Sequence, residues 1–173
     1  MTPTLECPPS EMTQARFVEA FGGVYEHSPW VAEQAFANGL DAQGDSAEVL
    51  ARLMGAIVDA SPANAKLKLL RAHPDLAGKL AVAGQLTVES RSEQAGSGLD
   101  QCSPEELEKF QQLNSAYTSK FGFPFIIAVS GYQRAEILSI FEKRLGNAPE
   151  DEFAEAIAQV HRIARLRIAN LIA

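Results

Sequence analysis

The chain has 173 residues, a length that suits one domain with a single hydrophobic core, and its hydrophobic content of 46% is ordinary for a globular protein. Asp and Glu number 22 against 15 for Lys and Arg, so the formal net charge is -7. This balance argues against nucleic-acid binding, because neutralising phosphates requires surplus Lys and Arg. No apolar run reaches membrane-spanning length, and residues 1–10 lack the basic and apolar regions of a signal peptide. We therefore expect a cytoplasmic protein with no membrane partner.

Cysteine and histidine spacing predicts no metal site. Cys7 and Cys102 fall in expected loop or terminal segments, and they suggest neither a disulfide framework nor a zinc site. The histidines, His27, His73 and His161, share no carboxylate cluster and no HxxxH spacing. We expect His27 to pack at a helix start, with a place at a pocket rim left open, and His161 to be solvated on the last helix.

The N-terminal part of the chain carries four helix-start signals. Residues 1–9 hold three prolines and are expected to be a loose lead-in. Each signal is a Ser or Asp ahead of apolar residues at helical spacing, and the four lie at Ser10, Ser28–Pro29, Asp45 or Ser46, and Ser61–Pro62. The first predicted helix ends at Gly22, and the second runs toward Asn38.

The C-terminal part predicts three more helices around one extended segment. Ser103 and Glu106 form a capping box for a helix that stops at Gly122, and residues 135–145 and 149–172 show helical periodicity. The run 123–129 has β-type composition, yet it contains Pro124 and has no partner run elsewhere, so we predict a buried extended segment rather than a sheet strand. The whole chain, 1–173, is thus predicted to be an all-α, single-domain bundle of about eight helices.

The stretch 71–99 indicates a functional site. His73 precedes Pro74, and a residue before proline disfavours the α region, so the fourth helix should end at residue 71 or 72 and leave His73 at its terminus. Asp75 is expected to cap a short helix starting with residues 76–79. Further on, Ser90 and Glu93 share a helix face, and the small residues after them leave room for a ligand.

Two other features could bind a small molecule. An extended segment in a helical protein leaves backbone N–H and C=O groups that need partners, and a flat heterocycle rich in amide groups would suit the backbone of Phe125, Ile126 and Ile127. Near the C-terminus, Arg167 carries a planar guanidinium suited to a carboxylate or ureido oxygen.

Three motifs carry a resemblance to a known family. HPDLAGK at 73–79, SRSEQAGSGL at 90–99 and FGFPFIIAVSG at 121–131 occur in the order and spacing of the OHCU decarboxylase family, which the chain resembles over nearly its whole length. Members of this family act on 2-oxo-4-hydroxy-4-carboxy-5-ureidoimidazoline in the breakdown of urate to allantoin. The resemblance implies a homodimer that uses no cofactor, with (S)-allantoin as product.

The resemblance also implies roles for the residues above. His73 and Glu93 would be catalytic, and the substrate-binding residues would be Pro74, Ser90, Phe125, Ile126, Ile127 and Arg167. A slip of register would put Arg162 or Arg165 in place of Arg167. Because the electron pair left by departing CO₂ can spread into a ring C=N, the protein needs to supply orientation and proton handling only. His73 would hold or accept the proton of the substrate hydroxyl, and the sequence leaves open whether His73 or Glu93 delivers the final proton.

Two alternatives stay open at the level of sequence. One is a cofactor-free hydrolase or isomerase that acts on a related ureide in the same pocket, which release of carbon dioxide would distinguish. The other is a non-enzymatic helical interaction domain that presents the run 123–129 to a partner. That alternative predicts association that depends on concentration, and no turnover of a small molecule.

Overall fold

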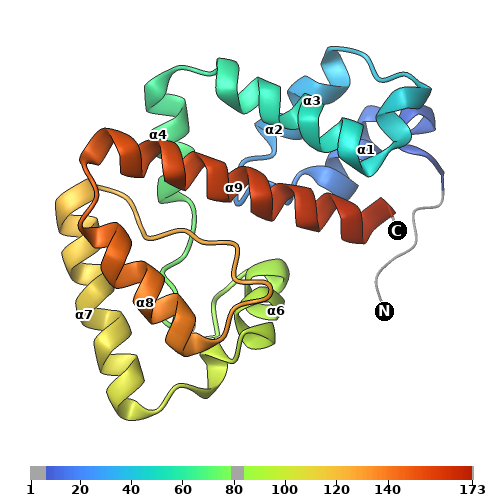
Figure 1. Cartoon of the computed structure of the whole chain (residues 1–173). Helices are drawn as coiled ribbons and strands as arrows, with labels where there is room; N and C mark the ends of the chain where they lie inside the picture. Colours follow the sequence, from blue (N-terminus) through green and yellow to red (C-terminus); the bar gives the residue numbers. More distant parts are fainter. Residues whose placement is uncertain (1–6, 79–83, 173) are drawn as a thin grey trace. The chain divides into compact units, whose positions relative to one another are not determined.

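The structure, a computed structural model, describes residues 7–78 and 84–172. These residues form eight α-helices and three 3-10 helices and contain no β-strand, which confirms the all-α prediction (Figure 1). Within the same ranges, none of the helices combines the length and the apolar character needed to cross a bilayer. Contacts divide the chain into two compact units, one made of residues 1–72 and 160–173 and the other of residues 73–159. The prediction of a single domain stays a prediction.

The first unit packs helices around an apolar core. Its elements are η1 (Pro9–Glu11), α1 (Gln14–Phe21), α2 (Trp30–Ala37), η2 (Ala42–Asp45), α3 (Ala47–Ala60), α4 (Ala63–Arg71) and the later part of α9 (Pro149–Ile172). Helix α1 packs on α2, and α2 packs on α3. The largest fully buried side chains of this core are Phe17, Phe21, Tyr25, Leu50, Met54, Leu69 and Leu70.

Three of the four predicted start signals act differently in the structure, because their serine hydroxyls bind other groups. Thr13 caps α1 by accepting the N–H of Arg16, whereas both the N–H and the hydroxyl of Ser10 bind the Asp45 carboxylate at 2.7 and 2.8 Å. A hydroxyl already bound to a distant carboxylate cannot cap its own helix. Ser28 and Ser61 likewise donate their hydroxyls to the carbonyls of residues 26 and 58, so neither caps its helix. The second, third and fourth helices nevertheless begin at residues 30, 47 and 63, each within one residue of its predicted start.

The second unit consists of the elements between residues 73 and 159. These are α6 (Val88–Gly96), η3 (Leu99–Gln101), α7 (Pro104–Phe121), α8 (Arg134–Leu145) and the first part of α9. The capping box of Ser103 and Glu106 is present at the start of α7, and Gly122 ends that helix with a φ of 78°. Helices α7 and α8 pack together, and their core is aromatic. The rings of Phe125 and Phe141 stack at 3.8 Å between centroids.

The chain between α7 and α8 follows the predicted extended path. Residues 124–129 have no helix or turn, and Figure 1 shows this segment as a drawn-out connection. Its residues from Phe125 to Val129 are at most 5% exposed. The predicted helix after Asp75 is wrong over residues 76–78, where the structure has a turn at residues 76–77 and no helix at residue 78, and its fourth residue, Lys79, lies outside the described residues.

Candidate active site

His73 lies directly after the end of α4, as predicted. The helix ends at Arg71, and the N–H of Ala72 donates to the carbonyls of Lys68 and Leu69 at 3.1 and 3.2 Å. His73 follows in a bend and is 8% exposed. Pro74 explains the break, because its ring disfavours helical geometry at the preceding residue.

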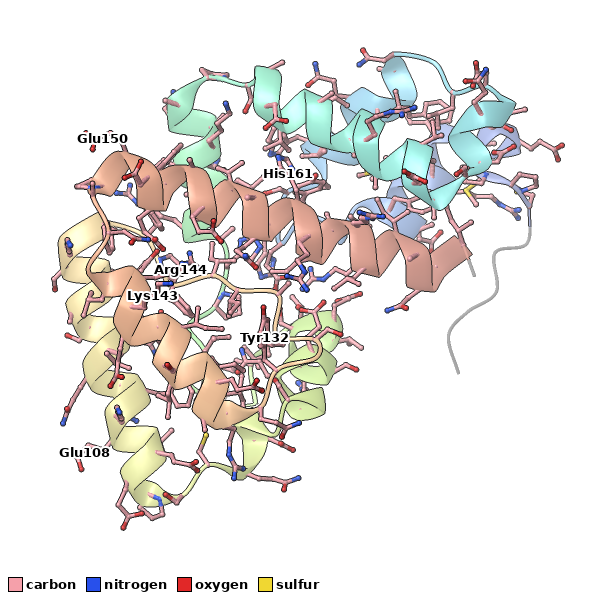
Figure 2. All side chains as sticks on the ribbon, in the orientation of Figure 1. Glu108, Tyr132, Lys143, Arg144, Glu150 and His161 are labelled. Carbon is pink, nitrogen blue, oxygen red and sulfur yellow. The ribbon has the colours of Figure 1, made fainter. Side chains whose placement is uncertain are left out.

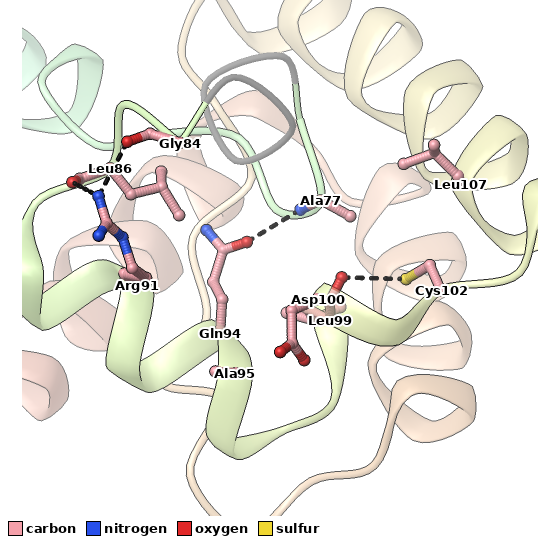
Figure 3. Close-up of a pocket in the computed structure, with 10 residues that line it drawn as sticks. All are labelled: Ala77, Gly84, Leu86, Arg91, Gln94, Ala95, Leu99, Asp100, Cys102 and Leu107. Carbon is pink, nitrogen blue, oxygen red and sulfur yellow. Dashed lines mark hydrogen bonds between the residues drawn. The ribbon is translucent and has the colours of Figure 1, made fainter.

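The turn after Pro74 is held by two amide side chains that sequence reasoning missed. Ala77 has a left-handed φ of 47°, a conformation that usually costs about 1–2 kcal/mol for a residue with a Cβ atom. Gln94 accepts the N–H of Ala77 at 3.1 Å (Figure 3), and it donates to the carbonyl of Asp75 at 3.4 Å. From α7, Asn114 donates to the carbonyl of Leu76 at 2.9 Å. These bonds therefore tie the turn that follows His73 to α6 and α7.

Polar atoms near this turn are partly shielded from water. Burial raises the pKa of the Asp75 carboxyl above its ordinary value. The Oδ1 atom of Asn114 is buried and has no hydrogen-bond partner among the described residues. A buried acceptor of this kind normally binds a protein group, an ordered water or a ligand.

Helix α6 presents a small polar face. Thr87 caps it by accepting the N–H of Ser90 at 3.2 Å. Ser90, Gln94 and Ser97 recur at helical spacing and are each at most 5% exposed. Glu93, three residues after Ser90, lies at the border of this face and is half-buried. The sequence signal that could have identified Gln94 is its place in the motif SRSEQ, directly after the predicted catalytic residue.

Two backbone groups of the extended segment are bound by side chains. The residue between them has no such partner in the described part of the chain. The carbonyl of Ile126 accepts Nη1 of Arg144 at 2.7 Å, and the N–H of Ala128 donates to Oε1 of Gln159 at 2.9 Å. Across residues 7–78 and 84–172, no group binds the backbone N–H or C=O of Ile127, which is 5% exposed. Because unpaired buried backbone is unfavourable, these two groups are suited to a ligand or to water.

Arg144, which binds this segment, also forms a buried ion pair with Glu152. Glu152 is fully buried, and its Oε1 accepts Nε and Nη2 of Arg144 at 2.9 and 2.5 Å and also the hydroxyl of Tyr117. Its Oε2 accepts the side-chain amide of Asn147 at 2.8 Å. Burial raises the pKa of the Tyr117 hydroxyl, and Glu152 raises it further, so Tyr117 remains a hydrogen-bond donor. Figure 2 labels Arg144 on α8.

Arg167 is buried in the first unit and pairs with a carboxylate that the sequence did not suggest. Its Nη1 donates to Oε2 of Glu26 at 2.7 Å and to the carbonyl of Gly23 at 3.2 Å. Arg167 is 5% exposed and Glu26 is 1% exposed, whereas Arg162 and Arg165 are exposed. Nothing in the short turn around Glu26 predicts a buried charge, because its partner lies 141 residues away in sequence.

His161 is not the solvated residue predicted from its position. Its Nδ1 lies 2.9 Å from the hydroxyl of Tyr25, and its Nε2 lies 3.0 Å from Oδ1 of Asp59. Tyr25 is buried and its hydroxyl needs a partner, which places the imidazole labelled on α9 in Figure 2 at the edge of the core. His27, by contrast, is exposed, so the prediction that it packs at a helix start is wrong.

A pocket of about 630 Å³ lies beside α6 in the second unit (Figure 3). Its walls include Ala77, Gln94 and Cys102, and none of the predicted site residues lines it. Burial raises the pKa of the Cys102 thiol, which donates to the carbonyl of Leu99. In the described part of the chain, no group of three or more His, Cys, Asp and Glu side chains is placed to hold a metal ion.

Seven of the eight predicted site residues belong to the second unit. They are His73, Pro74, Ser90, Glu93, Phe125, Ile126 and Ile127, whereas Arg167 belongs to the first unit. Within the second unit, Gln94 joins α6 to the turn after His73. The roles predicted for these residues stay predictions.

Several relatives of this chain are named as OHCU decarboxylases. An OHCU decarboxylase from Haloferax volcanii is 42% identical over 154 residues, which cover 89% of this chain and 88% of that protein. The OHCU decarboxylase of Mus musculus is 34% identical over 163 residues, covering 94% and 90%. A bifunctional uric acid degradation protein, PucL of Bacillus subtilis, is also 34% identical, but this chain covers only 32% of it.

Solved structures and a family model agree with these relatives. The structure is similar to a crystal structure of (S)-allantoin synthase, with a TM-score of 0.72 and 33% identity over 94% of this chain, and this chain spans 52% of that one. It is also similar to an OHCU decarboxylase solved in the presence of (S)-allantoin, with a TM-score of 0.66 and 25% identity, covering 84% of this chain and 92% of that one. The model of the OHCU decarboxylase family matches residues 10–169. This chain therefore belongs to the OHCU decarboxylase family.

Proposed function

We propose that this protein is a carboxy-lyase that converts 2-oxo-4-hydroxy-4-carboxy-5-ureidoimidazoline to (S)-allantoin in urate breakdown. Family membership over residues 10–169 supports the reaction class, and the relatives named for the decarboxylase and for (S)-allantoin synthase support the substrate and product. The structural observation that carries the proposal is the buried backbone of Ile127, whose N–H and C=O have no partner among residues 7–78 and 84–172. Its donor and acceptor match a flat ring with amide groups.

The reaction needs a proton acceptor and a proton donor, because its difficult step leaves an electron pair on carbon. The carboxylated carbon of the substrate also bears a hydroxyl and adjoins a ring C=N. When CO₂ leaves, the electron pair spreads into this C=N, and a proton then reaches the neighbouring carbon. No metal or cofactor is required by this chemistry.

His73 would handle the proton of the substrate hydroxyl. Histidine suits this role as a residue type, because the reference pKa of an imidazole is about 6.5. The turn that follows it is held at Ala77, Asp75 and Leu76 by side chains of α6 and α7, which supports a fixed imidazole. A proton acceptor that is already in place raises the reaction rate, because little entropy is lost in bringing it to the bound substrate.

The other predicted residues would orient the substrate. Glu93 would bind the ureido and ring N–H groups. The bound substrate would then be protonated from one face only, which gives a single enantiomer of allantoin. Ser90 and Pro74 would border the ligand, and the backbone of residues 125–127 would bind its amide groups. Arg167 would bind the carboxylate or ureido oxygen through its planar guanidinium.

The test is to generate the substrate in place with urate oxidase and hydroxyisourate hydrolase and to follow the circular dichroism of accumulating allantoin. We expect rapid formation of (S)-allantoin with the wild-type chain. In His73→Ala we expect a rate lower by about 10²–10⁴-fold, the usual contribution of a general acid or base. His27→Asn is the matched control, because His27 is exposed and Asn tolerates its positive φ of 48°.

The outcomes separate the proposal from its alternatives. Racemic allantoin at the uncatalysed rate with the wild-type chain would contradict the decarboxylase. Near wild-type activity in His73→Ala, with one-handed product, would keep the reaction and remove His73 from its centre. Loss of substrate alone is not a sufficient readout, because the substrate also decays spontaneously.

We further propose that the protein is a homodimer, as its resemblance to the family implies, and that it works in the cytoplasm, as its sequence led us to expect. Light scattering should then give twice the chain mass of 18.7 kDa. A mass of a single chain at micromolar concentration would contradict the dimer. Fractionation of the source cells tests the location.

A further inference from the structure

The extended segment 123–129 offers two backbone edges, and side chains from α8 and α9 hold one of them. In extended backbone, the N–H and C=O of one residue point to the same edge, and those of the next residue point to the opposite edge. Ile126 and Ala128 are two residues apart and therefore share an edge. Arg144 binds the C=O of Ile126 at 2.7 Å, and Gln159 binds the N–H of Ala128 at 2.9 Å. Ile127 presents its N–H and C=O to the other edge.

Both holding side chains are themselves fixed. Arg144 pairs with the fully buried Glu152, and its guanidinium carbon lies 4.5 Å from the centre of the Phe125 ring. Gln159 donates its Nε2 to Glu155 one helical turn earlier at 2.8 Å, which aims its Oε1 at Ala128. Arg144 and Gln159 thus each bind the segment through one polar atom and are fixed through others.

We propose that Arg144 and Gln159 are positioning residues for the substrate. They hold one edge of the segment in place, so that the N–H and C=O of Ile127 face the ligand at the other edge. This inference rests on the proposed function, in which the backbone of residues 125–127 binds the substrate. The substrate would contact the backbone of the segment rather than its side chains. The position of that backbone is set by the residues that bind its opposite edge.

Gln159 is the residue to vary, because it is half-buried and removing it leaves no buried charge. Arg144 is unsuitable, since its loss would strand the buried charge of Glu152. Gln159→Met keeps the length of the side chain but removes the acceptor for Ala128. The double variant Gln159→Glu with Glu155→Gln keeps an acceptor oxygen for Ala128, and it keeps the hydrogen bond between the two side chains because the amide at residue 155 now donates it. We expect Gln159→Met to raise KM about tenfold, with kcat changed by less than about threefold, because backbone alignment acts mainly on binding. The double variant should stay within about twofold of the wild-type KM.

Lys120→Met is the matched control for stability. Lys120 donates its Nζ to the carbonyls of Leu145 and Asn147 at 2.7 and 2.9 Å, in the same unit but outside residues 123–129. This variant also loses side-chain to backbone hydrogen bonds, so thermal unfolding should show a comparable loss of stability. Its KM should remain that of the wild type.

The same circular dichroism assay of allantoin formation decides the matter. An unchanged KM in Gln159→Met would overturn the inference. An equal rise in Lys120→Met would also overturn it, because the effect would then follow stability rather than alignment. A wild-type chain without turnover would contradict the proposed function itself, which a change confined to Gln159→Met would not.

Discussion

The buried ion pair of Arg167 and Glu26 fixes the position of one turn in the first unit. Both side chains are at most 5% exposed, and the guanidinium also binds the carbonyls of Gly23 and Val24. The pair therefore anchors the turn between α1 and α2 to the last helix of the same unit. If Arg167 also binds substrate, Glu26 is the group that orients it.

Removing one charge of this pair should be strongly destabilising. We expect Glu26→Ala to lower the free energy of unfolding by about 3–5 kcal/mol, because it removes a buried carboxylate that pairs with the buried guanidinium of Arg167. Glu142→Ala is the matched control, since Glu142 pairs with Lys109 at a similar 2.7 Å but both side chains are about half exposed. That change should cost less than about 1 kcal/mol. Urea unfolding followed by circular dichroism measures both values, and equal losses in the two variants would contradict the role of burial.

Single residues were predictable from sequence where a local pattern identified them. His73 was found from its place before a proline, and the chain does leave the helix there. Gln94, Asn114 and Glu26 were missed, because nothing in their own neighbourhood distinguishes them from solvated polar residues. Their positions depend on partners that lie between 17 and 141 residues away.

At the scale of elements, helix starts were predictable to the extent that their hydrogen bonds are local. The capping box at Ser103 and Glu106 involves groups three residues apart, and the structure contains both of its bonds. Ser10 fits the same rule in sequence, yet the carboxylate of Asp45, 35 residues away, binds its hydroxyl. A cap prediction thus fails where a tertiary partner competes for the same side chain.

The extended segment was predicted from composition and a proline, but its two edges were not. Alternation within the run 123–129 indicates which groups share an edge once the backbone is extended. It gives no information on which edge the protein itself binds. Arg144 and Gln159 decide this from other helices, by binding the edge that Ile126 and Ala128 share.

At the scale of the whole molecule, helix α9 contributes to both compact units. Ala156 and Ile157 are buried in the part that belongs to the second unit, and Ile163 and Ile168 in the part that belongs to the first. Unfolding either unit therefore removes the packing of part of one continuous helix. This continuity supports the prediction that the chain unfolds as a single domain.

We expect the two units to unfold together in urea, with the same midpoint for two separate probes. Trp30, the single tryptophan of the chain, reports on the first unit by fluorescence. Cys102 reports on the second unit through its reaction with a thiol reagent, in a Cys7→Ser background that leaves one cysteine. Two separate midpoints would show that the units are independent domains.

The sequence by itself determined the helical class, most helix boundaries, the turn at His73 and the three motifs of the family. Each of these depends on interactions between residues a few positions apart, or on residue types at fixed spacing, so the chain order contains them directly. The tertiary structure alone decided which polar groups are buried together. The partners of Ile126, Ala128 and Arg167 lie 18, 31 and 141 residues away, and such pairs form only when packed helices bring their side chains into one low-dielectric interior.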